Sequence, residues 1–225
     1  MAGSLSDTVI IFDLDGTLVD SAPDLTNALN HVLDGEGLQP VDPIAIRPMI
    51  GTGAVVAMKT AFSLRGRPYP EGEKASGLLA RFLAYYTDHI ADQSAPFPGL
   101  FPCLETLKAE GAALAVCTNK LEALAYPLLR ALDLEAPFDP IFGRDTLTEC
   151  KPSGLPLTEI MRRTGRTHAV MVGDTETDRG AAKAAGVPFA YASFGYGELD
   201  TPLNKKEQRF DGFEALFGTV TELLL

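Results

Sequence analysis

Apolar residues recur with two different spacings along this chain, and the spacing changes after about the first 20 residues. The run at residues 9–12 is short, β-branched and aromatic, which is typical of a buried strand. From about residue 22 to residue 93 the apolar residues instead recur three and four positions apart, as on one face of a helix. The pattern therefore predicts one strand followed by a block of helices.

Beyond residue 99 the pattern alternates between short apolar runs and amphipathic segments. The predicted strands are 112–117, 140–143, 168–172 and 188–192, and the predicted helices are 101–110, 122–131, 155–164, 179–185 and 214–224. This alternation favours an α/β fold with a doubly wound, parallel, Rossmann-like sheet centred on five strands. Residues 1–19 and 95–225 would form this core. Residues 20–94 would be an inserted helical cap domain, for which we favour a moving lid over a rigid addition to the core.

Composition restricts the partners and the setting of the protein. The chain has 225 residues, a net charge of −11, 46% hydrophobic residues and 22% charged residues, as is usual for a soluble globular protein. The negative charge argues against general binding to nucleic acids or to anionic membranes. Three cysteines without a CxxC pair, and no signal or membrane-spanning stretch, favour a reduced, cytoplasmic setting. We expect a monomer or a homodimer.

Two carboxylates follow the first predicted strand. Asp13 and Asp15 are two positions apart, so both point to the same side of the strand end, and Gly16 lets the backbone turn away. Two close like charges are costly unless a cation such as Mg²⁺ or a shared proton offsets them. One carboxylate could then attack phosphorus while the other transfers protons. We assign Asp13 as the nucleophile and Asp15 as the acid/base; the alternative is an ordinary Asp-Gly turn after a strand.

Further polar side chains follow later predicted elements. They are Thr118 and Asn119 after 112–117, Lys151 before Pro152, and Asp174 and Asp178 after 168–172. Ligands of open α/β sheets bind beyond the carboxyl ends of the strands, so we expect these groups to meet at one site. Thr118 could grip a phosphate, Lys151 could neutralise it, and Asp174 could join Asp13 on a metal. Each also has a structural explanation: helix capping for Thr118 and Asp174, and a solvated surface charge for Lys151.

The order of these motifs resembles the haloacid dehalogenase (HAD) superfamily of phosphohydrolases over nearly the whole chain. The motifs are Asp13-Leu14-Asp15-Gly16-Thr17-Leu18-Val19-Asp20-Ser21, Thr118, Lys151-Pro152 and Gly173-Asp174-x-x-x-Asp178, and the inserted helices resemble the C1 cap. The resemblance implies that Asp13 is nucleophile and Mg²⁺ ligand, that Asp15 also gives the ion a backbone carbonyl, and that Asp174 completes the metal ligands. It further implies phosphate binding by Thr118 and Lys151, with Asn119 beside them and Asp178 in support.

Within that superfamily the chain most resembles the phosphoglycolate phosphatases. The segments that carry this resemblance are 117–120, 142–147, 194–197 and the cap segment 47–53. It implies Mg²⁺-dependent hydrolysis, through an aspartyl-phosphate, of a small phosphorylated metabolite that also has a carboxylate, such as 2-phosphoglycolate. Arg47 or Lys59 of the cap is the expected partner of that carboxylate.

Other functions on the same fold stay open. A phosphomutase similar to β-phosphoglucomutase would use the same aspartyl-phosphate, but it must keep water away and hold a sugar bisphosphate. A phosphatase of another sugar phosphate or of pyrophosphate would share the motifs. A dehalogenase is disfavoured, since it needs no acid at position 15. A non-enzymatic phosphorylation module would lack the cap and Asp15, and it would give a stoichiometric burst without turnover.

Overall fold

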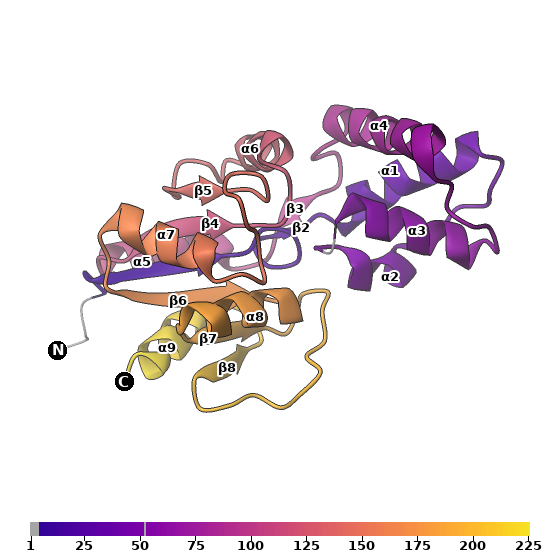
Figure 1. Ribbon diagram of the computed structural model, residues 1–225. Coiled ribbons are helices and arrows are strands. Elements are labelled where there is room, and N and C mark those ends of the chain that lie inside the picture. The colour runs from indigo at the N-terminus through magenta and orange to yellow at the C-terminus, as the bar shows by residue number, and fades with distance from the viewer. Residues whose placement is uncertain (1–4, 52) are drawn as a thin grey trace.

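In the computed structural model the chain forms a parallel sheet covered by helices, with a second group of helices beyond one end of the sheet (Figure 1). The structure describes residues 5–51 and 53–225. Thr52, part of the segment 47–53, lies outside the described residues, as do residues 1–4, where we expect no signal region. Within the described ranges no helix is both long and apolar enough to cross a membrane.

The predicted α/β class with a parallel sheet is confirmed, and the sheet has one strand more than expected. Its order in the described residues is β5-β4-β1-β6-β7-β8, and every neighbouring pair is parallel. The strands are β1 (Thr8–Phe12), β4 (Ala113–Cys117), β5 (Ile141–Phe142), β6 (His168–Gly173), β7 (Phe189–Ala192) and β8 (Glu207–Phe210). The sequence pattern predicted no strand in the stretch that holds β8. Because β8 is an edge strand with a single apolar residue, it has no apolar run that would predict it.

The strand β1 lies in the middle of the sheet and is buried on both faces. Ile10 and Phe12 pack with the helices of one face, and Val9 and Ile11 pack with those of the other. The first face is covered by α5 (Leu100–Ala109), α6 (Glu122–Ala131) and α9 (Phe213–Leu223), and the second by α7 (Leu155–Thr164) and α8 (Glu176–Ala185). Full burial of a Val, Ile or Phe side chain contributes roughly 1.5–3 kcal/mol. The strand is therefore a firm support for the residues that follow it.

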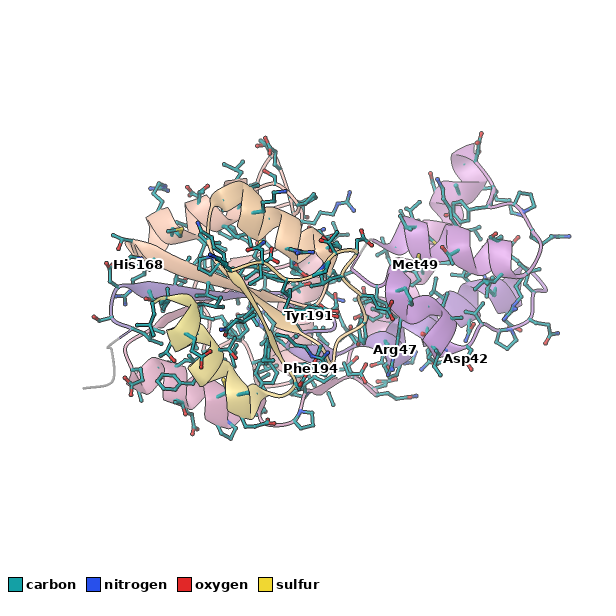
Figure 2. The ribbon with its side chains drawn as sticks, turned by 90° about the horizontal axis from the view of Figure 1, so that it is seen from below. Asp42, Arg47, Met49, His168, Tyr191 and Phe194 are labelled. Atoms are coloured by element: carbon teal, nitrogen blue, oxygen red, sulfur yellow. The ribbon has the colours of Figure 1, made fainter. Side chains whose placement is uncertain are left out.

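Four helices form a separate unit, here called the helical unit (residues 22–88). Its elements are α1 (Ala22–Gly35), α2 (Pro43–Ile46), the 3₁₀ turn η1 (Arg47–Met49), α3 (Ala54–Leu64) and α4 (Gly72–Asp88). They bury a second apolar cluster, which also includes Leu124 and Tyr196 of the core. In Figure 2, His168 at the start of β6 lies at the end of the sheet remote from this unit, whereas Tyr191 and Phe194 lie nearer to it. The carboxyl ends of the strands therefore face the helical unit.

Two short strands connect the core to the helical unit. β2 (Val19–Asp20) pairs in antiparallel fashion with β3 (Ala95–Pro96). The buried Asp24 carboxylate accepts hydrogen bonds from the backbone N–H groups of Gln93 at 3.0 Å and Ser94 at 2.8 Å. Both connections are therefore held side by side. We keep residues 20–94 as our proposal for the extent of the cap domain.

Candidate active site

The predicted site residues lie beyond the carboxyl ends of three neighbouring strands. Asp13 follows β1, Thr118 follows β4 and Asp174 follows β6, and β1 is the strand between the other two. The backbone N–H of Asp13 still donates to the carbonyl of Val172 on β6 at 2.9 Å, which fixes where the side chain begins. The predicted site residues that are buried here are Asp13, Asp15, Thr118, Lys151, Asp174 and Asp178. The fold thus gathers side chains that are far apart in sequence.

The ammonium of Lys151 lies between two carboxylates. Its Nζ is 2.8 Å from Oδ1 of Asp13 and 2.5 Å from Oδ1 of Asp178. Burial would lower the pKa of Lys151, but the two carboxylates outweigh this effect and raise the pKa above its ordinary value. The side chain therefore stays charged. Lys151 is a fixed, buried cation beside Asp13, and the alternative of a solvated surface charge is wrong.

Asp178 connects Lys151 to the start of α8. Its Oδ2 accepts hydrogen bonds from the backbone N–H of Thr175 at 3.0 Å and from the hydroxyl of the same residue at 2.6 Å. Thr175 is the N-cap, and its side chain and that of Asp178 form a capping box. Helix capping therefore explains the contacts between Thr175 and Asp178. Asp174 takes no part in the cap.

Asp174 is held by hydrogen bonds from two other segments. The hydroxyl of Thr17 donates to Oδ1 at 2.8 Å, and the backbone N–H of Tyr196 donates to Oδ2 at 2.8 Å. The turn after β1 passes close to the Asp174 carboxylate. Gly16 in this turn has φ 86°, and a Cβ there would lie 2.5 Å from Oδ2 of Asp174. Only glycine fits this turn without strain or collision. We did not predict the contacts of Thr17 and Tyr196, although both residues lie in segments that carry the family resemblance.

Asp13, Asp174 and Asp178 form a group of carboxylates that fits a divalent cation. One oxygen of each lies within 4.8 Å of the others. When all three are ionised, the single ammonium of Lys151 leaves two negative charges unbalanced in a buried space. Burial and the Asp178 carboxylate raise the pKa of Asp13 to about 8, and the same two causes raise the pKa of Asp174 to about 6. Oxygen ligands with unbalanced negative charge suit a hard divalent ion.

The group differs from the predicted ligand set in one respect. Asp178, expected only in support, is a member of it. The ligand atom predicted for Asp15 is its backbone carbonyl, so a group of side-chain oxygens leaves that prediction open.

The carboxylate of Asp15 is held by residues from both parts of the molecule. The Ser21 hydroxyl donates to Oδ1 at 2.6 Å, and Nζ of Lys120 lies 2.9 Å from Oδ1. The same Nζ donates to the hydroxyl oxygen of Tyr86 on α4 at 2.8 Å. We did not predict roles for Lys120, Ser21 or Tyr86. The signals for Lys120 were its place directly after Thr118 and Asn119 and its membership of the segment 117–120, which carries the family resemblance.

Thr118 and Asn119 lie beside the two buried lysines. The Thr118 hydroxyl oxygen accepts from the backbone N–H of Lys120 at 3.1 Å, so its own proton is left to donate to a ligand. The Asn119 amide nitrogen donates to the backbone carbonyl of Lys151 at 3.0 Å. Its Oδ1 is buried and has no partner within the described ranges. Because an unpaired buried acceptor is costly, this oxygen is suited to a donor on a bound ligand.

A cavity of about 450 Å³ lies between Asp15 and the helical unit. Asn119 and Lys120 border it on the core side, and apolar side chains of α1, α3 and α4 border it on the other. Arg144, on the loop after β5, also lines the cavity, and its guanidinium has no ion pair in the part of the chain that the structure describes. The cavity therefore offers space for a leaving group next to Asp15.

Arg47 and Lys59 are not among the residues that line this cavity. Arg47 lies on the side of the helical unit that faces the core (Figure 2), where its Nη2 is 3.7 Å from Oδ2 of Asp20. Its guanidinium carbon is also 5.8 Å from the centre of the Tyr196 ring. Lys59 lines a separate surface hollow with Ser63 and other residues of the helical unit. Of the predicted site residues, Asp15 and Asn119 line the cavity, and Asp13, Lys151, Asp174 and Asp178 lie together beside it. Arg47 and Lys59 belong to neither group.

Comparison with known proteins identifies the family. The family model of haloacid dehalogenase-like hydrolases matches residues 10–192. A phosphoglycolate phosphatase of Caulobacter vibrioides is 43% identical over 196 residues, 86% of this chain and 82% of that protein. One of Mesorhizobium japonicum is 39% identical over 223 residues, 98% of each. A solved structure from Haemophilus somnus, described as a predicted phosphoglycolate phosphatase, has a TM-score of 0.85 at 29% identity and covers 94% of this chain and 97% of its own. This chain therefore belongs to the haloacid dehalogenase-like hydrolase family and is one of its phosphatases.

Proposed function

We propose that this protein is a Mg²⁺-dependent hydrolase of small phosphomonoesters that works through an aspartyl-phosphate on Asp13. The observation that carries the proposal is the grouping of Asp13, Lys151, Asp174 and Asp178 around one buried point, with Asp15 on the turn that follows Asp13. Phosphoryl transfer needs a nucleophile, compensation of phosphate charge and a proton donor. These residues can supply all three.

In the first step an oxygen of Asp13 attacks phosphorus and the bond from phosphorus to the ester oxygen breaks, while Asp15 gives that oxygen a proton. Oδ1 of Asp13 is held by Lys151 at 2.8 Å and by the backbone N–H of Leu14 at 2.7 Å, which leaves Oδ2 for the attack. In the second step water attacks the phosphorus of the aspartyl-phosphate and gives a proton to Asp15. Inorganic phosphate then leaves, and the Asp13 carboxylate is restored.

The negative charge of the phosphoryl group is balanced by groups already fixed in the site. Lys151 is a buried cation beside the nucleophile, and the Thr118 hydroxyl can donate to a phosphoryl oxygen. Asp13, Asp174 and Asp178 would hold the Mg²⁺ ion, which supplies further charge neutralisation when bound.

The substrate that we propose is 2-phosphoglycolate. The proposal is supported by the relatives named phosphoglycolate phosphatase, one of which matches 98% of this chain. The leaving group would enter the cavity beside Asp15, where Arg144 is a basic residue without an ion pair in the described ranges. We therefore prefer Arg144 to Arg47 and Lys59 as the partner of the substrate carboxylate. We keep a cytoplasmic setting and a monomer or homodimer as proposals.

Phosphate release from a panel of esters tests this function. The panel contains 2-phosphoglycolate, β-glucose 1-phosphate, pyrophosphate, nucleotides and other sugar phosphates, each with Mg²⁺ and with EDTA. We expect turnover that needs Mg²⁺ and is concentrated on 2-phosphoglycolate. Turnover spread over other phosphomonoesters would support the phosphatase function but reject 2-phosphoglycolate as the specific substrate. Conversion of β-glucose 1-phosphate to glucose 6-phosphate without phosphate release would instead support a mutase.

Mg²⁺ is expected to stabilise the protein more at about pH 8 than at about pH 6. Without metal, the folded-state pKa of Asp13, about 8, lies above the ordinary value of 3.8, so the stability that this group contributes is lost as pH rises toward 8. A divalent ion binds the ionised carboxylates and restores this stability, by about 2.7 kcal/mol at roughly 100 times its Kd. For a chain of this size that corresponds to about 5–10 °C in Tm.

Thermal melting with saturating Mg²⁺ and with EDTA at both pH values measures this difference. Ca²⁺, a larger ion, provides a comparison for the size of the site. A Tm gain from Mg²⁺ that is equal at the two pH values, or larger at the lower one, would contradict the assignment of these carboxylates as ligands.

A further inference from the structure

Lys120 is a buried cation that joins the helical unit to the acid/base residue of the core. Only 4% of its side chain is exposed. Nζ lies 2.9 Å from Oδ1 and 3.2 Å from Oδ2 of Asp15, and it donates to Oη of Tyr86 at 2.8 Å. The same Nζ is 4.6 Å from the centre of the Tyr86 ring, within the range of cation–π attraction. One ammonium is therefore shared between the two parts of the molecule.

The two carboxylate oxygens of Asp15 have different surroundings. Oδ1 accepts hydrogen bonds from Ser21 at 2.6 Å and from Lys120 at 2.9 Å, whereas Oδ2 has only the longer contact with Lys120 within the described ranges. Two short hydrogen bonds, one of them charge-assisted, fix Oδ1 and with it the plane of the carboxyl group. Oδ2 is left to exchange a proton, and Asp15 lines the cavity proposed for the leaving group.

Tyr86 connects this arrangement to the helical unit. Its side chain is fully buried in the apolar cluster of that unit. Burial raises the pKa of Tyr86 to about 12, so it stays a neutral phenol whose oxygen can accept from Lys120. A buried ammonium needs partners for its three N–H groups, and the two oxygens of Asp15 and the oxygen of Tyr86 supply them. If α4 moved away, the ammonium of Lys120 would lose one of its three hydrogen-bond acceptors, the oxygen of Tyr86.

We propose that Lys120 is a positioning residue for Asp15, and that Tyr86, through Lys120, makes proton delivery to the leaving group depend on the seating of α4 over the site. The inference rests on the proposed phosphatase function, because it needs Asp15 as the acid. As the bond between phosphorus and the ester oxygen breaks, the proton moves from Oδ2 of Asp15 to that oxygen. Lys120 keeps its own protons, so Lys120 and Tyr86 act only on the geometry of the transfer.

The test compares two esters whose leaving groups differ in their need for a proton. The leaving group of 2-phosphoglycolate is an alkoxide that needs the acid, whereas p-nitrophenolate leaves without it. The ratio kcat/KM reports the steps up to the aspartyl-phosphate, in which this proton is delivered. We expect Lys120→Met to lower kcat/KM for 2-phosphoglycolate roughly a hundredfold and Tyr86→Phe roughly tenfold. For p-nitrophenyl phosphate we expect changes of less than about threefold.

Tyr85→Phe is the matched control. Tyr85 is also on α4, but its ring stacks on His31 and lies tilted against His89, and it does not line the cavity beside Asp15. This variant should leave both values of kcat/KM unchanged. Tyr86→Phe removes only the hydroxyl and keeps the ring that packs in the apolar cluster. It therefore tests the inference even if Lys120→Met does not fold. Thermal melting of each variant shows whether it is folded.

Two results would overturn the inference. One is an equal loss on the two esters in a folded variant, which would assign Lys120 and Tyr86 a merely structural role. The other is no loss on 2-phosphoglycolate in Tyr86→Phe. Failure of the proposed function looks different, because the wild-type protein would then release phosphate from neither ester. If the wild type prefers another alkyl phosphate, that ester takes the place of 2-phosphoglycolate in the comparison.

Discussion

Replacement of Asp13 by asparagine is expected to abolish turnover while the protein keeps its fold. The amide has the shape of the carboxylate, but it lacks the anionic oxygen that must attack phosphorus. The change also removes one of the three carboxylates that fit the cation. We therefore expect kcat to fall at least roughly 10⁴-fold. The measurement is phosphate release from 2-phosphoglycolate at saturating Mg²⁺.

The stability of the same variant separates a chemical effect from a folding defect. Burial and the Asp178 carboxylate raise the pKa of Asp13 to about 8, so its charged form is unfavourable in the metal-free protein. After the substitution Lys151 keeps Asp178 as a partner at 2.5 Å. We therefore expect the Tm of Asp13→Asn in EDTA to equal or exceed that of the wild type, and the Tm gain from Mg²⁺ to shrink.

Asp34→Asn, on the exposed surface of α1, is the control for the substitution itself and should change neither rate nor Tm. Mass spectrometry is needed to show that the new asparagine has not deamidated back to aspartate. A rate near that of the wild type in intact Asp13→Asn would contradict the assigned nucleophile.

Much of the fold could be predicted because its central strand has a simple environment. All five residues of β1 are buried, since parallel strands lie on both sides and helices cover both faces. A strand of this kind gives a continuous apolar run in the sequence. Asp13 and Asp15 directly follow the run and could therefore be placed at a strand end. The order of the strands in space was not needed, because parallel strands bring their carboxyl ends to one edge.

Contacts that depend on the path of the chain in space could not be predicted in the same way. Tyr86 is one of several residues on the buried face of α4, and its spacing from Leu78 and Phe82 predicts only burial. Nothing in that spacing indicates that its hydroxyl contacts Lys120. The same holds for the backbone N–H of Tyr196 at Asp174, since the sequence does not show where a loop passes.

The two carboxylates of the first motif each have a buried lysine, but the two lysines differ in what else they contact. Lys151 pairs with Asp13 and with Asp178, so the surroundings of the nucleophile belong to the core alone. Lys120 pairs with Asp15 and with Tyr86 of the helical unit. A displacement of the helical unit would therefore leave the nucleophile in place and disturb the acid/base residue. This difference is the physical basis for treating the two residues separately in experiment.

Replacement of Asp15 by asparagine is expected to lower kcat for 2-phosphoglycolate roughly 10²–10⁴-fold. The amide oxygen of the new asparagine can still accept hydrogen bonds from Ser21 and Lys120, so we expect the local structure to be kept. An amide cannot deliver or take up the proton, however, and both steps of hydrolysis require this. The Tm gain from Mg²⁺ should remain, because the side chain of Asp15 is outside the carboxylate group that fits the ion. Asp13→Asn and Asp15→Asn therefore differ in metal binding as well as in rate.

With p-nitrophenyl phosphate, Asp15→Asn should show a burst followed by slow turnover. The first step needs no acid for this leaving group, so about one equivalent of p-nitrophenolate per site is released quickly. The second step still needs Asp15 to accept a proton from water, and the aspartyl-phosphate accumulates. Rapid-mixing absorbance measures the burst, with Asp34→Asn as the control that shows ordinary turnover. A wild-type kcat on 2-phosphoglycolate would exclude Asp15 as the acid/base, and loss of the Mg²⁺ effect would instead make its side chain part of the metal site.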